Sequence, residues 1–294
     1  MLASKTKNSG KITCNAYAKI NLTLDIIGKR ADGYHLLQMV MQSVSLCDTM
    51  TLFKKESGGI QLACDHPNIP CDEHNTVIKA VNSFCSYCKI TDANIEIDIA
   101  KRIPSQAGLA GGSADAAAVL RELNQLYRTD LSTEQLCEIG LTVGADVPFC
   151  ICGGTVLAEG TGELLTPLAP MPHCFLVLCK PLVNVNTAQA YALADGAAAF
   201  THPNTAAMCK AVGESDLNAI CNNLSNVFEQ ILTLPEVDKI KQKMTAMGAL
   251  GCCMTGSGSV VFGIFKEKSS AQHCKQELEK NYQEVFVCEP RNPG

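Results

Sequence analysis

Residues 102–123, RIPSQAGLAGGSADAAAVLREL, have the composition of a loop that binds an anion. Gly108, Gly111 and Gly112 allow the backbone amides to approach a ligand closely and to adopt positive φ. The alanine-rich run that follows is typical of a helix, whose N-terminus presents unpaired N–H groups and the positive end of its dipole. The segment therefore predicts a phosphate site, in which Ser113 caps the helix or turns its hydroxyl toward a phosphate or Mg²⁺.

The glycine spacing excludes the two commonest nucleotide motifs. No GxxxxGK[ST] occurs in the chain, and Gly108, Gly111 and Gly112 do not fit GxGxxG. On composition alone, a glycine-rich turn that binds nothing stays open as an alternative. A second Gly/Ser cluster, MTGSGSVVFG at residues 254–263, taken by itself indicates a hairpin turn more than a binding loop.

Two ionisable side chains add acid–base chemistry. Residues 12–26 alternate apolar and polar side chains, which predicts a strand with one buried and one polar face, on which Lys19 and Asn21 point the same way, about 7 Å apart. Asp146, in GADVP, lies between a helix end and a proline, where an acid serves as a general base or as a turn former. Taken singly, a solvated lysine and a turn aspartate are the favoured interpretations.

The elements that must position these groups follow from hydrophobic periodicity. Strands are expected at residues 12–26, 35–46, 48–53 and 95–99, and helices at 74–88, from Gly112 or Ser113 onward, and from a capping box at Ser132 to Gly144. Residues 162–174 carry three prolines and are a candidate linker. Beyond it we expect a strand at 174–181, helices at 187–195, 215–232 and 235–247, a hairpin on TGSGS, a helix at 267–281 and a strand at 284–289. This mixture predicts an α+β fold rather than a doubly wound parallel sheet.

Composition narrows the class of protein. A net charge of −5 with no basic cluster argues against nucleic acid as the main partner and favours small molecules, and no apolar run is long enough to span a membrane. The segment MLASKTKNSG has no apolar core of a signal peptide, so we expect a cytoplasmic protein. The seventeen cysteines are odd in number and set in apolar stretches, which indicates reduced, buried thiols. Cys85 and Cys88 have metal or redox spacing, but no second pair answers them, and helix packing is favoured.

Four stretches in this order resemble the GHMP small-molecule kinases. They are AYAKINLTLDIIGKRADGYHLL, PSQAGLAGGSADAAAVL, LTVGADVPFCICGGTVLAEGTGE and MTGSGSVVFGIF, and the resemblance covers about residues 12–290. Within them, GKRADGYH resembles the branch that phosphorylates a cytidine-diphosphate-linked polyol in non-mevalonate isoprenoid synthesis. The resemblance implies two domains, a ribosomal-protein-S5-like α/β domain at residues 1–166 and a ferredoxin-like α+β domain at 167–294.

The resemblance also implies a reaction and a role for each site residue. The γ-phosphoryl group of ATP, with Mg²⁺, passes to the 2-hydroxyl of the polyol; Asp146 takes the hydroxyl proton, Lys19 steadies the developing charge, and Asn21 holds the substrate. The cytosine contacts are implied for Tyr34, His35 and Tyr191, with Thr187 as a further substrate contact. The ATP contacts are implied for Asn75 and Lys101 near the adenosine and for the loop Pro104, Ser105, Gln106, Ala107, Gly108, Leu109, Ala110, Gly111, Gly112, Ser113 and Ala114.

Two alternatives stay open on the sequence. A GHMP kinase for another alcohol, such as homoserine, mevalonate or a sugar, would keep Asp146 and the glycine loop without needing the cytosine contacts. A non-catalytic nucleotide-sensing or RNA-binding module on the same scaffold is the other. Gln106 and Ala110 depart from the glycines that this family often has there, and Ala110 is expected to fit if its φ is negative. We expect a monomer or homodimer.

Overall fold

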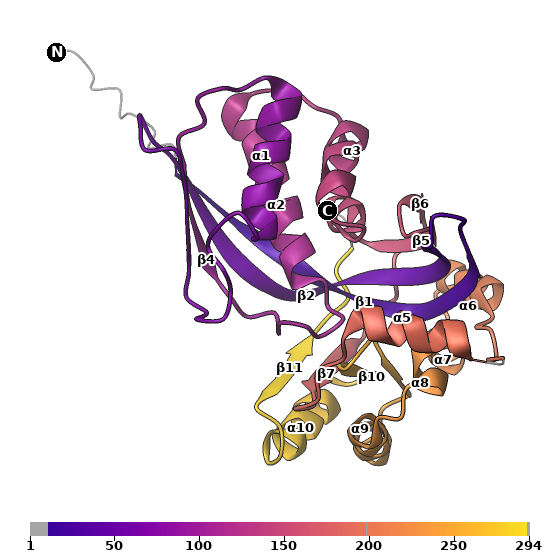
Figure 1. Cartoon of the computed structure of the whole chain (residues 1–294). Helices are drawn as coiled ribbons and strands as arrows, with labels where there is room; N and C mark the ends of the chain where they lie inside the picture. The colour runs from indigo at the N-terminus through magenta and orange to yellow at the C-terminus, as the bar shows by residue number, and fades with distance from the viewer. Residues whose placement is uncertain (1–10, 198, 293–294) are drawn as a thin grey trace.

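The computed structural model describes residues 11–197 and 199–292, which form two β-sheets with helices packed against them (Figure 1). Residues 1–10, on which the expectation about a signal peptide rests, lie outside the described residues. None of the helices among the described residues is long and apolar enough to cross a bilayer. The mixture of antiparallel sheets and helices confirms the predicted α+β class.

The first sheet is built on two very long strands that pair antiparallel. Its order is β3-β4-β2-β1-β8, and β5 and β6 extend it from β2. The helices α1, α2 and α3 gather on one side of it (Figure 1). The elements are β1 (Lys11–Lys29), β2 (His35–Lys54), β3 (Ile60–Cys64), α1 (Thr76–Cys88), β4 (Ile95–Ala100), α2 (Gly111–Tyr127), α3 (Thr133–Val143), α4 (Val147–Cys152), β5 (Thr155–Gly160) and β6 (Leu164–Pro167).

The second sheet is antiparallel, in the order β11-β7-β10-β9. Some of its apolar side chains, with those of α9 and α10, share a buried cluster with the end of β1 and the start of β2, and others belong to the cluster that contains the core of the first sheet. The two sheets therefore have no solvent layer between them. The elements are β7 (Phe175–Lys180), α5 (Thr187–Gly196), α6 (Thr205–Gly213), α7 (Leu217–Asn222), β8 (Ser225–Asn226), α8 (Phe228–Ile231), α9 (Pro235–Ala246), β9 (Gly251–Met254), β10 (Val261–Phe265), α10 (Lys268–Glu279) and β11 (Glu284–Cys288).

Most expected elements are present, and the exceptions have local reasons. The capping box at Ser132 is formed with Gln135, and the hairpin on TGSGS is β9–β10. The two strands expected at 35–46 and 48–53 are one strand, β2. The helix expected at 215–232 is wrong, because Asn226 pairs in parallel with β1 and splits the segment into α7, β8 and α8. The linker candidate at 162–174 contains β6, which pairs with β5, so the domain division at residues 166 and 167 stays a prediction.

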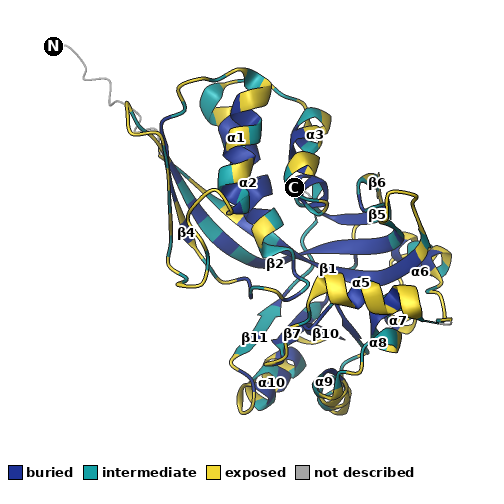
Figure 2. Ribbon diagram, viewed as in Figure 1, coloured by how far each residue is buried: buried dark blue, intermediate teal, exposed yellow. Residues whose placement is uncertain are grey.

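From Lys19 to Asp25 the polar face of β1 is buried, contrary to the expectation of one buried and one polar face, whereas Thr13 and Asn15 at its start are exposed. Lys19, Asn21, Thr23 and Asp25 are each at most 4% exposed. Figure 2 shows the central strands as buried along much of their length, with exposed residues on the outer faces of the helices. Alternation correctly separates the two faces of the strand, but it cannot show that the β9–β10 turn and His202 cover the polar one at Asn21 and Asp25.

Candidate active site

Two cavities meet at the glycine-rich loop. The first, about 990 Å³, is lined by Lys19, Asp146, the β1–β2 turn and α5. The second, about 750 Å³, is lined by the loop, the start of α1 and Lys101. Residues that line both are Gln106, Gly108, Ala110, Ser113 and Asn184. A group held by the loop therefore lies between two spaces, each large enough for a small molecule.

The loop ends in an uncapped helix N-terminus. Helix α2 begins at Gly111, and the residue before it, Ala110, has a left-handed backbone (φ 56°, ψ 33°) and gives no side-chain cap. The first turn of α2 contains no acidic side chain. Its first amides have no partner within the helix and face a cavity that Gly111, Gly112 and Ser113 line, which suits an anion.

Two expectations about this loop are corrected. Ser113 lies in the first turn of α2 instead of capping it, because the helix starts one or two residues earlier than expected. Ala110 does not have the negative φ on which its fit was expected to depend, and Gln106 also has positive φ, at 52°. Both positions that depart from glycine thus adopt backbone conformations that glycine adopts most easily.

The loop is held between β1 and the β9–β10 turn. The amide of Lys19 donates to the carbonyl of Leu109 at 3.2 Å, and Thr255 Oγ1 lies 3.3 Å from the carbonyl oxygen of Gly108. A Cβ added at Gly108 would lie only 2.1 Å from the backbone oxygen of Thr255. The close approach of these two backbones is the reason that position 108 requires glycine.

Lys19 and Asp146 face one another where the cavities join. Lys19 Nζ lies 4.0 Å from Asp146 Oδ2, with the lysine buried and the aspartate 37% exposed. Asp146 precedes α4 and makes no capping hydrogen bond, so its carboxylate is available to the cavity that it lines. A buried cation beside an accessible carboxylate can stabilise negative charge and accept a proton at the same place.

Asn21 contacts the lysine of this pair. Its Oδ1 accepts hydrogen bonds from Lys19 Nζ at 2.7 Å and from the Gly256 amide at 3.0 Å, and Thr255 Oγ1 lies 3.2 Å away. The side chain is fully buried and does not line either cavity. In the structure Asn21 therefore orients Lys19 and the β9–β10 turn, and direct contact with a substrate stays a prediction.

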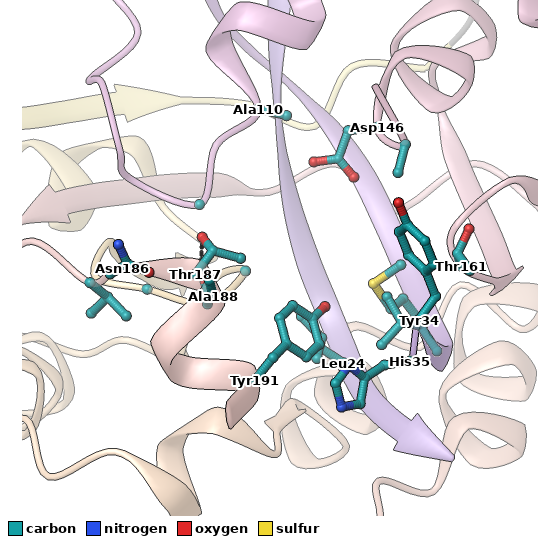
Figure 3. A pocket seen from close by; sticks show the side chains of 18 of the residues that line it. Leu24, Tyr34, His35, Ala110, Asp146, Thr161, Asn186, Thr187, Ala188 and Tyr191 are labelled. Atoms are coloured by element: carbon teal, nitrogen blue, oxygen red, sulfur yellow. Dashed lines mark hydrogen bonds between the residues drawn. The ribbon is translucent and has the colours of Figure 1, made fainter. Parts of the chain in front are cut away.

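The three predicted cytosine contacts line the first cavity together with Asp146, and in Figure 3 Tyr34 lies between Asp146 and the pair His35 and Tyr191. His35 stacks on Tyr191 with ring centroids 4.7 Å apart, and Tyr191 meets Phe228 edge-on. Tyr34 is 66% exposed at the β1–β2 turn. Burial, with a smaller effect of the Asp146 charge, raises the pKa of Tyr191 to about 12, so its hydroxyl stays a donor. Thr187 Oγ1 lies 2.9 Å from Ser257 Oγ, and both residues line the first cavity.

The predicted adenosine contacts are largely engaged within the protein. Asn75 caps α1 through Val77 and also donates to the carbonyl of Pro70. Lys101 is buried between the carboxylates of Asp48 and Asp115, and both Asn75 and Lys101 line the second cavity.

Asp115 is the most perturbed acid of the described residues. Lys101 Nζ lies 2.7 Å from Asp115 Oδ2, and Asp115 Oδ1 is buried without a hydrogen-bond partner. Burial raises the pKa of Asp115 to about 7, although the Lys101 charge opposes this. Burial lowers the pKa of Lys101, but the charges of Asp115 and Asp48 outweigh it and raise the pKa. The group therefore binds a proton near neutral pH more readily than an ordinary aspartate.

Sequence reasoning missed three residues that organise the site. Asp195 contacts His35 and Lys29, Thr255 joins Asn21 to the glycine loop, and Asn226 donates to the carbonyls of Met254 and Gly256. Only Thr255 had a signal, because it begins the Gly/Ser cluster that was expected to be a turn; Gly256, Ser257 and Gly258 of that cluster also line the first cavity. The other two depend on contacts between distant segments.

Two groups of residues are candidates for metal binding. Among the described residues, one cluster of three candidate ligands is found, Asp72, Glu73 and His74, and it is exposed. The Ser113 hydroxyl and the Asp146 carboxylate both line the first cavity, and hard oxygen ligands are those that Mg²⁺ prefers.

Comparison with known sequences gives a consistent result along the chain. The model of the GHMP kinases N terminal domain matches residues 75–154, and that of the GHMP kinases C terminal matches residues 202–284, together more than half of the chain. The chain is 44% identical over 275 residues to 4-diphosphocytidyl-2-C-methyl-D-erythritol kinase of Clostridium tetani (strain Massachusetts / E88), which covers 92% of this chain and 97% of the relative.

Solved structures agree with the sequence matches. A crystal structure of 4-(cytidine 5'-diphospho)-2C-methyl-D-erythritol kinase superposes with a TM-score of 0.78 at 29% identity, over 96% of this chain and all of the other. A homoserine kinase from Cytophaga hutchinsonii ATCC 33406 superposes with a TM-score of 0.75 at 21% identity, over 99% of this chain and 98% of the other, which shows a shared fold alone.

Proposed function

The chain belongs to the GHMP kinases, and within them to the family of 4-diphosphocytidyl-2-C-methyl-D-erythritol kinases, and from this membership we propose the reaction that it catalyses. The γ-phosphoryl group of ATP is transferred to the 2-hydroxyl of 4-diphosphocytidyl-2-C-methyl-D-erythritol, a step in isoprenoid precursor synthesis. The two domains are proposed to divide at residues 166 and 167, and the protein to be a cytoplasmic monomer or homodimer. The seventeen cysteines are odd in number and set mostly in apolar stretches, which supports a reducing compartment.

The observation that carries the proposal is the meeting of two cavities at one helix N-terminus. ATP is assigned to the cavity lined by Asn75, Lys101 and the loop, and the cytidylated alcohol to the cavity lined by His35 and Tyr191. In that arrangement the γ-phosphate lies between the uncapped amides of α2 and the Lys19–Asp146 pair. The transferred group and its acceptor are thereby held together, which is most of what phosphoryl transfer asks of a protein.

The residues at the junction divide the chemistry. Asp146 accepts the proton of the attacking 2-hydroxyl, or orients that hydroxyl toward the phosphorus, while Lys19 stabilises the negative charge of the transferring group. Asn21 fixes the Lys19 ammonium through its 2.7 Å hydrogen bond. Ser113 and Asp146 offer oxygen ligands for Mg²⁺ alongside the ATP phosphates, and that ion would neutralise phosphate charge.

The base site in the same cavity supports the cytidylated substrate. Tyr191 and His35 provide flat faces, and His35 and the Tyr191 hydroxyl provide polar groups, which suit a planar base with donors and acceptors on its edge. The acceptor hydroxyl, beside Asp146, and the base, beside His35 and Tyr191, are then held in one cavity, as a polyol joined to cytidine by a diphosphate requires.

An ADP-release assay with ATP and Mg²⁺ tests the proposal. We expect turnover with 4-diphosphocytidyl-2-C-methyl-D-erythritol and none with homoserine, mevalonate or galactose under the same conditions. Turnover of another alcohol alone would contradict the assignment of the base site, and ATP binding without turnover of any alcohol would favour a nucleotide-sensing protein.

A further inference from the structure

Asp195 holds the ring of His35 from its edge while Tyr191 holds it from its face. His35 Nε2 lies 2.7 Å from Asp195 Oδ1, and the His35 and Tyr191 rings stack at 4.7 Å with an interplanar angle of 25°. Tyr191 and Asp195 lie four residues apart on α5, so they occupy one face of that helix and reach the same ring. The three side chains form a clamp across 160 residues of sequence.

Lys29 keeps the Asp195 carboxylate ionised. Lys29 Nζ lies 2.6 Å from the second oxygen, Asp195 Oδ2, and these hydrogen bonds from Lys29 and His35 lower the pKa of Asp195. An ionised carboxylate only accepts hydrogen bonds, so the ring nitrogen that faces it must carry a proton. In a neutral imidazole, the proton on Nε2 leaves Nδ1 as a lone-pair acceptor.

The lone pair on Nδ1 can accept a hydrogen bond from a ligand, because His35 lines the first cavity. No hydrogen bond to His35 Nδ1 is made by the part of the chain that the structure describes. Cytosine carries an exocyclic amine that donates, whereas uracil carries a carbonyl oxygen at the same position that can only accept. A lone pair therefore accepts from the amine of cytosine and repels the carbonyl of uracil.

We propose that Asp195 is a positioning residue for base selection, which fixes the Nε2-protonated form of His35 so that Nδ1 accepts a hydrogen bond from the amine of a cytosine nucleotide. This inference rests on the proposed function and adds to it the group that decides between pyrimidines. Asp195 acts through His35 and does not take part in phosphoryl transfer, since it lies at the base end of the cavity beside His35 and Tyr191.

A purely structural role is the competing explanation. Lys29 lies at the end of β1 and His35 at the start of β2, so Asp195 also fastens the β1–β2 hairpin to α5. A fastening role predicts lost stability or a lowered kcat with no change in the choice of base. Base selection predicts a changed ratio between cytosine and uracil nucleotides, and the two roles can therefore be separated.

The experiment compares Asp195→Ala, Asp195→Asn and the control Glu289→Ala. Glu289 is also a surface carboxylate next to a histidine, with Oε2 3.7 Å from His173 Nε2, but it lines neither cavity. Asparagine keeps an acceptor for Nε2–H, so Asp195→Asn should restore most of what alanine removes. Binding of CDP and UDP is measured by calorimetry, and KM and kcat by ADP release.

We expect Asp195→Ala to raise KM for the cytidylated alcohol about tenfold or more, with kcat and KM for ATP changed less than about twofold. Its preference for CDP over UDP should fall about tenfold, while Glu289→Ala keeps the wild-type ratio. An unchanged CDP-to-UDP ratio in a folded Asp195→Ala protein would overturn the proposal. A wild-type protein that binds no cytidine nucleotide would instead overturn the proposed function and this inference together.

The tautomer is measured independently of activity. Long-range ¹H–¹⁵N spectra of the ligand-free protein, with His35→Ala used to assign the ring, should show Nδ1 unprotonated in the wild type and mixed tautomers in Asp195→Ala. A wild-type His35 protonated on Nδ1 alone would contradict the proposal whatever the binding data show.

Discussion

Lys19 and Asp146 lie 4.0 Å apart in the first cavity, and substitution of Asp146 tests its role in the reaction. Asp146→Asn keeps the size and the hydrogen-bonding oxygen of the side chain but removes proton affinity and charge. We therefore expect kcat to fall about 100-fold or more while ATP binding stays nearly unchanged, because a positioned base contributes to the transition state and not to nucleotide affinity. Steady-state kinetics and ATP titration calorimetry measure the two effects.

The size of that loss distinguishes two roles for Asp146. A loose phosphoryl-transfer transition state needs little help from a base, so an aspartate that only orients the hydroxyl would lose much less on substitution with asparagine. An Asp146→Asn enzyme with wild-type kcat would remove Asp146 from the mechanism altogether.

Asp115 makes stability depend on pH in an unusual direction. Its pKa is about 7 in the folded protein, against an ordinary value of 3.8, so the folded state keeps a proton that the unfolded state releases between these values. The stabilisation is complete below about pH 4 and is lost as the pH rises to about 7. Relative to Asp115→Asn, which cannot ionise, the wild type should lose unfolding free energy as the pH rises across this window, because its folded state binds the proton more tightly than its unfolded state.

Urea unfolding of both proteins at pH 4, 5, 6, 7 and 8 measures this difference. Comparing the two proteins at each pH cancels the other carboxylates, which act in the opposite direction in acid. A difference that stays constant from pH 4 to 8 would show that Asp115 is ionised throughout.

At the scale of elements, the glycine loop and the β9–β10 turn approach one another too closely for a side chain. Gly108→Ala would place Cβ 2.1 Å from the Thr255 oxygen, and the three atoms nearest that Cβ are all backbone, so the turn must move. Gly59 has a similar φ, +68° against +73°, but nothing lies within 4 Å of its added Cβ, which makes it a matched control.

We expect Gly59→Ala to cost about 1 kcal/mol of unfolding free energy, the usual penalty for alanine with positive φ. Gly108→Ala should cost more and should also raise KM for ATP, because the displaced loop carries the amides of α2. Denaturant unfolding and ATP kinetics provide the comparison, and equal losses in the two variants would show that the backbone contact at Gly108 is unimportant.

The elements show where sequence reasoning succeeds and where it stops. The α3 helix was predictable from its start to its end because its signals are local, a capping box at Ser132 and a glycine at 144. The break at Asn226 was not, because that residue is held by the carbonyls of Met254 and Gly256, from a turn that lies far along the chain. Local patterns specify local hydrogen bonds, and a tertiary contact overrides a weak helical period.

In the candidate site too, some residues could be predicted from the sequence and others could not. The glycine loop, Lys19 and Asp146 were named from the sequence, and they line the first cavity or the second, except for Leu109 and Ala114 of the loop, which are buried and line neither. The roles of Lys19 and Asp146 nevertheless came from the family resemblance, since a solvated lysine and a turn aspartate were favoured when each was taken alone. Asp195 could not be found, because nothing near it in the sequence indicates that it meets His35.

At the scale of the whole molecule, the active site lies where the two sheets meet, and Asn21, with Asn226, is one of the side chains that join them. It is fully buried on β1 of the first sheet, and its Oδ1 accepts from Lys19 and from Gly256, in the turn of the second sheet. Removing this acceptor leaves the buried Lys19 ammonium with only Asp146, 4.0 Å away, and leaves the buried Gly256 amide without this partner, which is more costly than losing one exposed hydrogen bond. Stability and catalysis are therefore linked at this residue.

Asn21→Ala should consequently lower the unfolding free energy by about 3 kcal/mol and lower kcat at least tenfold, since Lys19 loses its 2.7 Å partner. Asn21→Asp keeps the acceptor and supplies a second one, so it should retain more stability than alanine. Denaturant unfolding and steady-state kinetics of both variants provide the measurement. If Asn21→Ala kept wild-type stability but lost affinity for the cytidylated alcohol, Asn21 would be a direct substrate contact, and the join between the sheets would depend on the backbone contact of Gly108 with Thr255 instead.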